Sequence, residues 1–348
     1  MTETSAYDYE LPRELIAQQP LRQRSDARLM VADRRRQSLE HAHVRDLPGI
    51  LQPGDCLVIN DTKVIPARLV GYRSGTGGRW TGLFLSAQEV GLWRVMSKTR
   101  GKLTSGETVT LVDQQGRDLA RLVMLTDLGD GVWAARPEPS GPALELLERV
   151  GRVPLPPYIR GGEMVDLDKS TYQTVFANKP GAIAAPTAGL HFSTELLSEL
   201  DVRGVTVCRV TLHVGTGTFR PITSQRIGEH KMDAEWGCID GSCVDQLEET
   251  RRRGGRIVAV GTTAVRVLET AALSGTLQRW EGDTELFITP PYEFCATGAL
   301  MTNFHLPKTT LLVLVHAFGG SKLMRQAYQE AVLERYRFYS YGDTMLIL

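Results

Sequence analysis

The stretch Ala184-Ala-Pro-Thr-Ala-Gly-Leu-His-Phe192 is followed by residues 193–210 and then by Thr211-Leu-His-Val-Gly-Thr-Gly-Thr-Phe-Arg-Pro221. It predicts a loop, a helix capped by Ser193 or Thr194, a strand over 205–214 with alternating apolar residues, and a second loop. Each loop combines glycines, hydroxyl groups, a histidine and a phenylalanine. Glycine lets backbone N–H groups approach a ligand, and the side chains supply adjustable donors and acceptors. We therefore expect both loops to line a ligand site.

The alternation of helices and strands continues towards the C-terminus. Residues 256–270 predict a strand, a Gly-Thr-Thr turn and a helix, and further helices are expected over 311–318 and 322–335. Strands are expected over 284–289 and 344–348, the second of them at a sheet edge. Regular alternation of this kind is typical of a mixed α/β core.

Residues 65–152 have a different pattern. Short β-like segments are separated there by glycine-rich turns such as Ser74-Gly-Thr-Gly-Gly78. Closely spaced strands with turn signals between them are typical of a small antiparallel barrel. The sequence thus predicts a discontinuous α/β catalytic domain over 1–64 and 153–348, with an inserted β-barrel domain over 65–152.

Composition argues against several classes of protein. The chain has 348 residues, and its 40 Lys and Arg balance 40 Asp and Glu, so RNA would have to meet a local basic patch. The polar N-terminus is not a signal peptide, and the longest apolar run, residues 311–318, is too short to span a bilayer. Five cysteines do not suggest a disulfide framework, so a cytoplasmic protein is expected. The motifs of Rossmann dehydrogenases, P-loop NTPases, zincins and α/β-hydrolases are absent.

Histidines stand at expected strand ends. His213 precedes the run Gly215-Thr-Gly-Thr218, and His191 lies in the loop before the helix. An imidazole at the end of a strand in a parallel sheet suits proton transfer or hydrogen bonding to a ligand. A satisfied histidine in a tight turn is the alternative. His230 and Glu235 would supply an imidazole and a carboxylate for acid–base work, although an exposed polar turn explains them equally well.

Two further loops carry polar groups. Gly261-Thr-Thr263 opens a helix, where free N–H groups favour a carboxylate or a phosphate; an ordinary threonine cap is the alternative. His305 lies in the loop that begins the buried helix over 311–318. Cys238 and Cys243 have no second pair at metal-ligand spacing, and the spacing of the histidines matches no ligand pattern. We therefore expect no metal.

Eight motifs along the chain can be compared with the sequence patterns of known families. In chain order they are Tyr7-Asp-Tyr-Glu-Leu-Pro12, Asn60-Asp-Thr-Lys-Val-Ile-Pro-Ala-Arg68, Gly151-Arg-Val-Pro-Leu-Pro-Pro-Tyr-Ile159, Tyr172-Gln-Thr-Val-Phe-Ala177, Ala185-Pro-Thr-Ala-Gly-Leu-His-Phe192, Leu212-His-Val-Gly-Thr-Gly-Thr-Phe219, Val260-Gly-Thr-Thr263 and Thr302-Asn-Phe-His-Leu-Pro-Lys308. Their order and content closely resemble the S-adenosylmethionine:tRNA ribosyltransferase-isomerase family of bacterial queuosine biosynthesis. The resemblance spans nearly the whole chain.

The resemblance implies an unusual use of S-adenosylmethionine. Its ribosyl part is transferred to 7-aminomethyl-7-deazaguanine at the wobble position of tRNA. There it is rearranged to the epoxycyclopentane of epoxyqueuosine, with release of adenine and methionine. The resemblance also implies a monomer and no stable protein partner.

Roles for individual residues follow from the resemblance together with their chemistry. At the reacting groups we expect His191, His213 and Glu235 to handle protons, and His230 and His305 to position the substrates. For contact with S-adenosylmethionine we expect Thr187, Gly189, Phe192, Gly215, Thr216, Gly217, Thr218, Phe219, Thr262, Thr263 and Asn303, with the two phenylalanines stacking on a base. For contact with the tRNA we expect Arg22, Arg24, Arg28, Arg34, Arg35, Arg36, Asn60 and Arg68.

Two positions depart from the family pattern, and two other functions compete. Asp233 stands where a second histidine is expected, and His316 stands where a small residue is expected, so we interpret His316 as a packing residue.

The competing functions are a non-catalytic tRNA-binding module and an S-adenosylmethionine-dependent RNA methyltransferase. The methyltransferase is disfavoured because its glycine-rich strand–turn–helix is missing.

Overall fold

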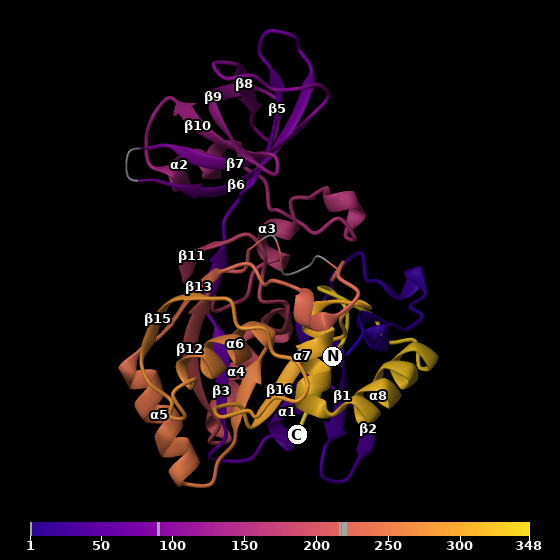
Figure 1. Ribbon diagram of the computed structural model, residues 1–348. Coiled ribbons are helices and arrows are strands. Elements are labelled where there is room, and N and C mark those ends of the chain that lie inside the picture. The colour runs from indigo at the N-terminus through magenta and orange to yellow at the C-terminus, as the bar shows by residue number, and fades with distance from the viewer. Residues whose placement is uncertain (1, 89–90, 216, 218–220) are drawn as a thin grey trace. The chain divides into compact units, whose positions relative to one another are not determined.

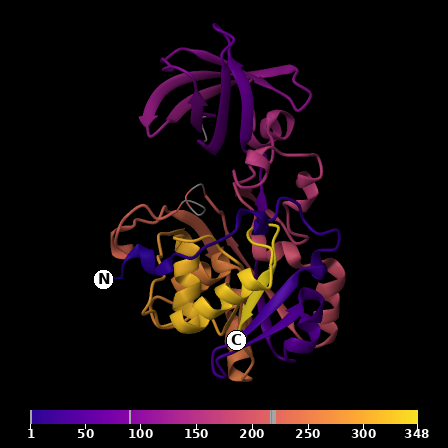
Figure 2. The same cartoon turned by 90° about the vertical axis from the view of Figure 1, so that its right-hand side faces the viewer.

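The chain divides into two compact units. A computed structural model describes residues 2–88, 91–215, 217 and 221–348. The larger unit comprises Met1–Lys63, Tyr158–Gly161 and Ser170–Leu348, and the smaller comprises Val64–Pro157 and Gly162–Lys169. Figures 1 and 2 show the ribbon from two directions.

A nine-stranded mixed sheet forms the framework of the larger unit in the described residues. In sheet order its strands are β15 (Trp280–Thr284), β13 (Glu235–Ile239), β12 (Thr206–Leu212), β3 (Cys56–Asn60), β14 (Ile257–Val260), β16 (Ala299–Asn303), β17 (Thr344–Ile347), β1 (Arg28–Asp33) and β2 (Ser38–His43). Strands β12, β3, β14 and β16 run parallel to their neighbours in this series, so their carboxyl ends meet at one edge.

Helices cover both faces of this sheet. The helices of the chain are α1 (Leu47–Ile50), α2 (Ala143–Val150), α3 (Asp168–Thr171), α4 (Thr194–Val202), α5 (Gly241–Arg252), α6 (Thr262–Ala271), α7 (Thr310–Gly319) and α8 (Ser321–Leu333). Helices α5 to α8 pack on the face that carries Val58, and α1 and α4 on the face that carries Leu57. Because both faces are covered, β3 is buried at every position, as expected of a central parallel strand.

The smaller unit contains a closed antiparallel barrel. Around it run β10 (Val132–Glu138), β7 (Trp93–Thr99), β6 (Arg79–Ala87), β5 (Arg68–Arg73), β8 (Thr108–Val112) and β9 (Asp118–Gly129). Trp80 and Trp93 fill its interior. A Cβ atom on Gly82 would lie 2.2 Å from the Trp80 indole, so only glycine fits beside that ring. The predicted fold class, a mixed α/β core with a small β-barrel, is confirmed.

Two predicted strands need correction. Residues 285–289 are not a strand, because β15 already ends at Thr284. At the end of the strand the Thr284 carbonyl accepts a hydrogen bond from Arg266 at 3.0 Å, and beyond it the Leu286 carbonyl accepts one from the same side chain at 3.2 Å. The C-terminal strand β17 lies inside the sheet between β16 and β1, not at an edge. The remaining short segments are β4 (Thr62–Val64) and β11 (Lys179–Ala182).

Candidate active site

A pocket opens at the carboxyl edge of the parallel strands, where doubly wound sheets bind their ligands. Three of the loops expected from the sequence meet in it, namely 185–188, 261–263 and the 302–305 segment through Thr302, Asn303 and His305. Tyr339 and Ser340 complete the wall from a part of the chain in which no site residue was expected. Ser340 also lines a neighbouring pocket that contains His191 and Arg22.

Asn303 connects two of these loops. Its Oδ1 accepts a hydrogen bond from Thr187 Oγ1 at 2.9 Å, and its Nδ2 donates to His191 Nε2 at 3.1 Å and to the Tyr339 carbonyl at 3.2 Å. Since an amide N–H can only donate, His191 Nε2 is an acceptor. Burial lowers the pKa of His191 to about 4. His191 is therefore a neutral, fixed residue at neutral pH.

The N-terminus of α6 presents free donors to the pocket. Gly261 precedes the helix with φ of 90°, a conformation that favours glycine, and provides no side-chain cap. Thr262 and Thr263 are buried. The Thr263 hydroxyl has no hydrogen-bond partner among the described residues. Unpaired N–H groups, the helix dipole and a free hydroxyl are the chemical groups that suit an anion.

His305 is held on three sides. Its Nε2 lies 2.8 Å from Thr302 Oγ1. Its backbone N–H donates to the Tyr328 hydroxyl at 3.1 Å, and its carbonyl accepts from the Tyr9 hydroxyl at 2.5 Å. Burial lowers the pKa of His305 to about 3. This histidine too is neutral at neutral pH.

His213 lies at the end of β12, as predicted. Its Nδ1 is 2.7 Å from Thr62 Oγ1, and its ring stacks on Trp236 with centroids 5.0 Å apart. A Cβ atom on Gly181 would lie 2.6 Å from His213 Nε2, so that glycine leaves room for the ring. Burial lowers the pKa of His213. The neutral imidazole, which can accept a proton, is thus favoured.

Glu235 is part of a buried ion pair. One carboxylate oxygen accepts from the backbone N–H of Gly215 at 2.7 Å, and the other pairs with Arg266 Nη1. Both charged side chains are buried. His230 is half-buried against Phe287, with ring centroids 5.4 Å apart, and burial lowers its pKa. Sequence reasoning did not single out Arg266, although a charged residue within the apolar part of α6 was a usable signal.

Several expected ligand contacts are placed elsewhere. Phe192 is fully buried in the core and has no exposed face for stacking on a base. A Cβ atom on Gly189 would lie 2.8 Å from Phe176, so close packing alone requires a glycine here. Gly217 packs on Asp233 in the same way. Thr216, Thr218 and Phe219 lie outside the described residues.

The residues expected to contact tRNA do not share one surface. Arg24 donates to the backbone carbonyls of residues 170, 173 and 190, and burial lowers its pKa. Arg28 stacks on Tyr336, with 3.7 Å between the guanidinium carbon and the ring centroid. Asn60 is buried, and its amide bonds both backbone groups of Leu212.

Arg68 belongs to the smaller unit, where it pairs with Glu163 at 2.8 Å. Arg34, Arg35 and Arg36 follow β1 at the opposite edge of the large sheet, away from the pocket.

Neither a metal cluster nor a membrane-spanning helix is found in the described residues. Within that part of the chain, no group of three or more His, Cys, Asp or Glu residues is placed to hold a metal ion. In the same residues, no helix combines the length and apolarity that crossing a bilayer requires.

The fold and the pocket define an α/β protein with a candidate ligand site at the carboxyl edge of its sheet. Comparison with known proteins identifies its family. The family described as "Queuosine biosynthesis protein" matches residues 4–347. The chain therefore belongs to the queuosine biosynthesis protein family, as the motifs predicted.

Named relatives match this chain along nearly its whole length. A protein of Symbiobacterium thermophilum is 48% identical over 345 residues, with 99% of each chain covered, and one of Moorella thermoacetica is 47% identical over 343 residues, with 98% of each covered. Both are named S-adenosylmethionine:tRNA ribosyltransferase-isomerase. The crystal structure of S-adenosylmethionine tRNA ribosyltransferase from Thermotoga maritima matches with a TM-score of 0.56 and 37% identity, covering 99% of this chain and 100% of that one.

Proposed function

We propose that this chain is an S-adenosylmethionine:tRNA ribosyltransferase-isomerase. It transfers the ribosyl part of S-adenosylmethionine to 7-aminomethyl-7-deazaguanine at the tRNA wobble position and rearranges it to the epoxycyclopentane of epoxyqueuosine, releasing adenine and methionine. The observation that carries this proposal is the pocket at the carboxyl edge. It gathers loops 185–188, 261–263 and 302–305 in a chain whose relatives are named for this activity.

The methionine end of the substrate fits the N-terminus of α6. Its carboxylate would accept from the free N–H groups of the first turn and from the Thr263 hydroxyl, which is otherwise unpaired in the described structure. Asn303 holds Thr187 and His191 in place around it. A preorganised donor set of this kind loses little entropy on binding.

Proton transfer requires a base for the aminomethyl group and an acid for the departing adenine. His213 is our candidate for this transfer, because its lowered pKa keeps it neutral and its ring is fixed by Thr62 and Trp236. His191 and His305 act as positioning residues, since hydrogen bonds already hold their Nε2 atoms. Glu235 holds Gly215 through its backbone N–H. His230 is assigned to positioning as well.

We assign contacts with the tRNA to two parts of the protein. Arg22 is exposed beside the His191 pocket and suits a phosphate of the anticodon arm. The inserted β-barrel domain, over residues 65–152, is assigned to additional tRNA surface. We further propose that the protein acts as a monomer in the cytoplasm, without a metal and without a stable protein partner.

One assay tests this function against its rivals. The protein is incubated with S-adenosylmethionine and tRNA that carries 7-aminomethyl-7-deazaguanine, and small products are separated. Adenine and methionine in equal amounts are expected. S-adenosylhomocysteine would identify a methyltransferase, and tRNA binding without any turnover would identify a binding module. The variant His213→Ala should bind tRNA normally and lose turnover; unchanged turnover would refute our assignment of the base.

A further inference from the structure

A basin of about 980 Å³ lies at the amino edge of the large sheet, opposite the edge that carries the candidate active site. Strands β14 and β16 begin at this edge, and β1 and β17 end there. The two edges are separated by the length of a four- or five-residue strand, roughly 15 Å. The basin is therefore a separate surface of the larger unit.

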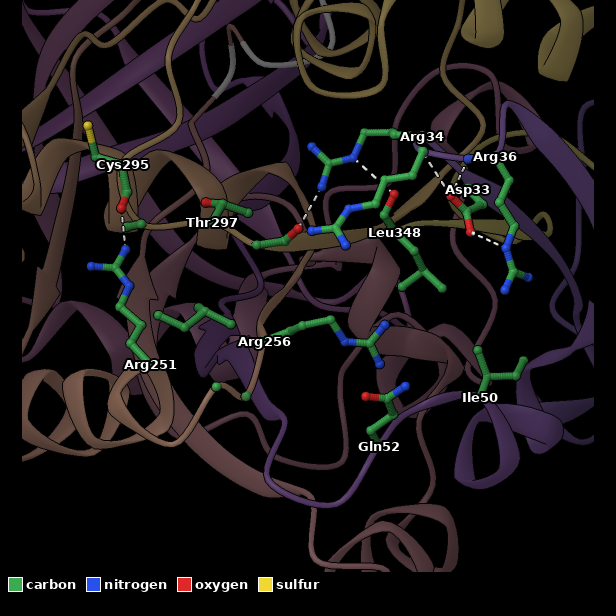
Figure 3. A pocket seen from close by; sticks show the side chains of 16 residues that line it. Asp33, Arg34, Arg36, Ile50, Gln52, Arg251, Arg256, Cys295, Thr297 and Leu348 are labelled. Carbon is green, nitrogen blue, oxygen red and sulfur yellow. Dashed lines mark hydrogen bonds and ion pairs between the residues drawn. The ribbon is translucent and has the colours of Figure 1, made fainter.

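Arginines dominate the charge of this basin. Five of them line it, against one acidic side chain, Asp33. They come from two segments far apart in the sequence, residues 34–36 and 251–256. Figure 3 shows the side chains of Arg34, Arg36, Arg251 and Arg256 around a common space. The five are Arg34, Arg35, Arg36, Arg251 and Arg256.

Two of the guanidinium groups are held by contacts with the protein itself. The buried carboxylate of Asp55 accepts from Arg256 Nε at 3.0 Å and from its Nη2 at 2.5 Å. Arg34 donates to a backbone oxygen of Leu348, the last residue of the structure, at 3.0 Å and to the carbonyl of Gly298 at 2.7 Å. Its guanidinium carbon lies 4.1 Å above the Phe318 ring centroid. These contacts hold two guanidinium groups in the wall before any ligand arrives, and the Asp55 carboxylate balances the charge of Arg256.

Arg251 is held in a similar way from the end of α5. It donates to Glu248 at 3.1 Å and to the carbonyl of Cys295. Figure 3 shows the second of these bonds on the far side of the basin from Arg36. Fixed arginines thus stand on two sides of the space.

Arg35 and Arg36 are left to face a ligand. Both are exposed, on the turn between β1 and β2. Asp33 accepts from the backbone N–H groups of both, and it meets the Arg36 side chain only at 3.7 Å. Among the described residues, the Arg35 side chain has no hydrogen bond or ion pair. The exposed neighbours Gln52 and Gly254 leave the rim open.

Planar guanidinium groups match phosphate oxygens in pairs, and an open, exposed cationic surface suits an extended polyanion. We propose that this basin binds backbone phosphates of the tRNA, as a contact surface additional to Arg22 and the β-barrel domain. The identity of the RNA rests on the proposed function. Binding at the basin itself requires only the phosphates of a polyanion.

Charge reversal at the rim tests this proposal. Arg35→Glu and the double variant Arg35→Glu/Arg36→Glu are compared with Arg279→Glu, which reverses an exposed arginine before β15 outside the basin. Affinity for an unmodified tRNA transcript is measured by fluorescence anisotropy at several salt concentrations, without S-adenosylmethionine. We expect Kd to rise about tenfold in the double variant, and the salt slope to fall by about one for each phosphate that the variant no longer binds. The Arg279 variant should change little.

Two results would overturn the proposal: an unchanged Kd and salt slope in the double variant, or an equal loss of affinity in the Arg279 variant. The second result would mean that only net charge matters. Binding is measured without turnover, so its outcome is independent of the proposed activity. If wild-type protein binds tRNA through the basin but releases no adenine, the proposed function fails and the basin stands. In an active enzyme, the double variant should keep its KM for S-adenosylmethionine at saturating tRNA.

Discussion

Thr62 Oγ1 lies 2.7 Å from His213 Nδ1 and joins the segment after β3 to the end of β12. The threonine is itself held, because its backbone N–H donates to Asn60 Oδ1 at 3.1 Å. Asn60 Oδ1 also accepts from the Leu212 N–H at 3.1 Å. The buried Asn60-Asp61-Thr62 segment between β3 and β4 therefore fixes the imidazole that we assign to proton transfer.

The variant Thr62→Val should lower kcat about tenfold and leave the KM for S-adenosylmethionine nearly unchanged. Valine keeps the shape of threonine but loses a hydrogen bond worth about 1 kcal/mol, and with it the ring orientation. Single-turnover rates across a range of pH measure the effect. Thr62→Ser restores the hydroxyl and should recover most of the rate. A serine variant as slow as the valine variant would show that packing, not the hydrogen bond, is what matters.

The Glu235–Arg266 pair leads to a prediction about stability. Glu235→Gln should destabilise the protein by roughly 3 kcal/mol, because it leaves the Arg266 charge buried without its partner. Urea unfolding measures the loss. The double variant Glu235→Gln/Arg266→Met removes both charges and should recover much of it. If the single variant folds as stably as wild type yet loses all turnover, Glu235 has the catalytic role expected from the sequence.

Local patterns predicted the elements and the loops that meet in the pocket. Ser193 caps α4 by accepting from the Leu196 N–H at 3.2 Å, as its position before an apolar helix indicated. The pairing of Glu235 with Arg266 joins residues 31 positions apart, and no local signal marks it. The same arginine binds the carbonyls that residues 284–289 would have needed to form a strand.

The position of the Arg34–Arg36 turn also depends on long-range pairing. Its place opposite the pocket follows from β1 lying beside β17, which joins the N-terminal and C-terminal ends of the larger unit. The sequence alone predicts one tRNA surface that includes the Arg34–Arg36 turn. The sheet order places this turn at the edge opposite the candidate active site.

Buried histidines predict a loss of stability in mild acid. Burial lowers the pKa of His191 to about 4 and that of His305 to about 3, from an ordinary value of 6.5. Below pH 6.5 the unfolded chain takes up protons that the folded protein excludes. The contribution of these histidines to the free energy of unfolding is therefore fully present above pH 6.5. It falls as the pH drops towards 4, by about 1.4 kcal/mol per pH unit for each histidine.

Urea unfolding at a series of pH values between 4 and 7 checks this slope. The variant His191→Gln should unfold with a shallower dependence on pH, smaller by the contribution of one proton. An unchanged slope in that variant would mean that His191 takes up its proton in the folded state.

A variant of Thr263 tests whether its hydroxyl binds the substrate or only supports the fold. Its hydroxyl is buried without a partner among the described residues, so Thr263→Val should keep the free protein as stable as wild type or raise its stability by about 1 kcal/mol. If the hydroxyl binds the carboxylate of S-adenosylmethionine, the same variant should bind it about tenfold more weakly. Thermal unfolding with and without S-adenosylmethionine measures both effects. Thr302→Val is the matched control, because its hydroxyl contacts His305 Nε2 at 2.8 Å and its loss should destabilise the free protein. A Thr263→Val protein that is stabilised by S-adenosylmethionine as strongly as wild type would remove the N-terminus of α6 from the substrate site.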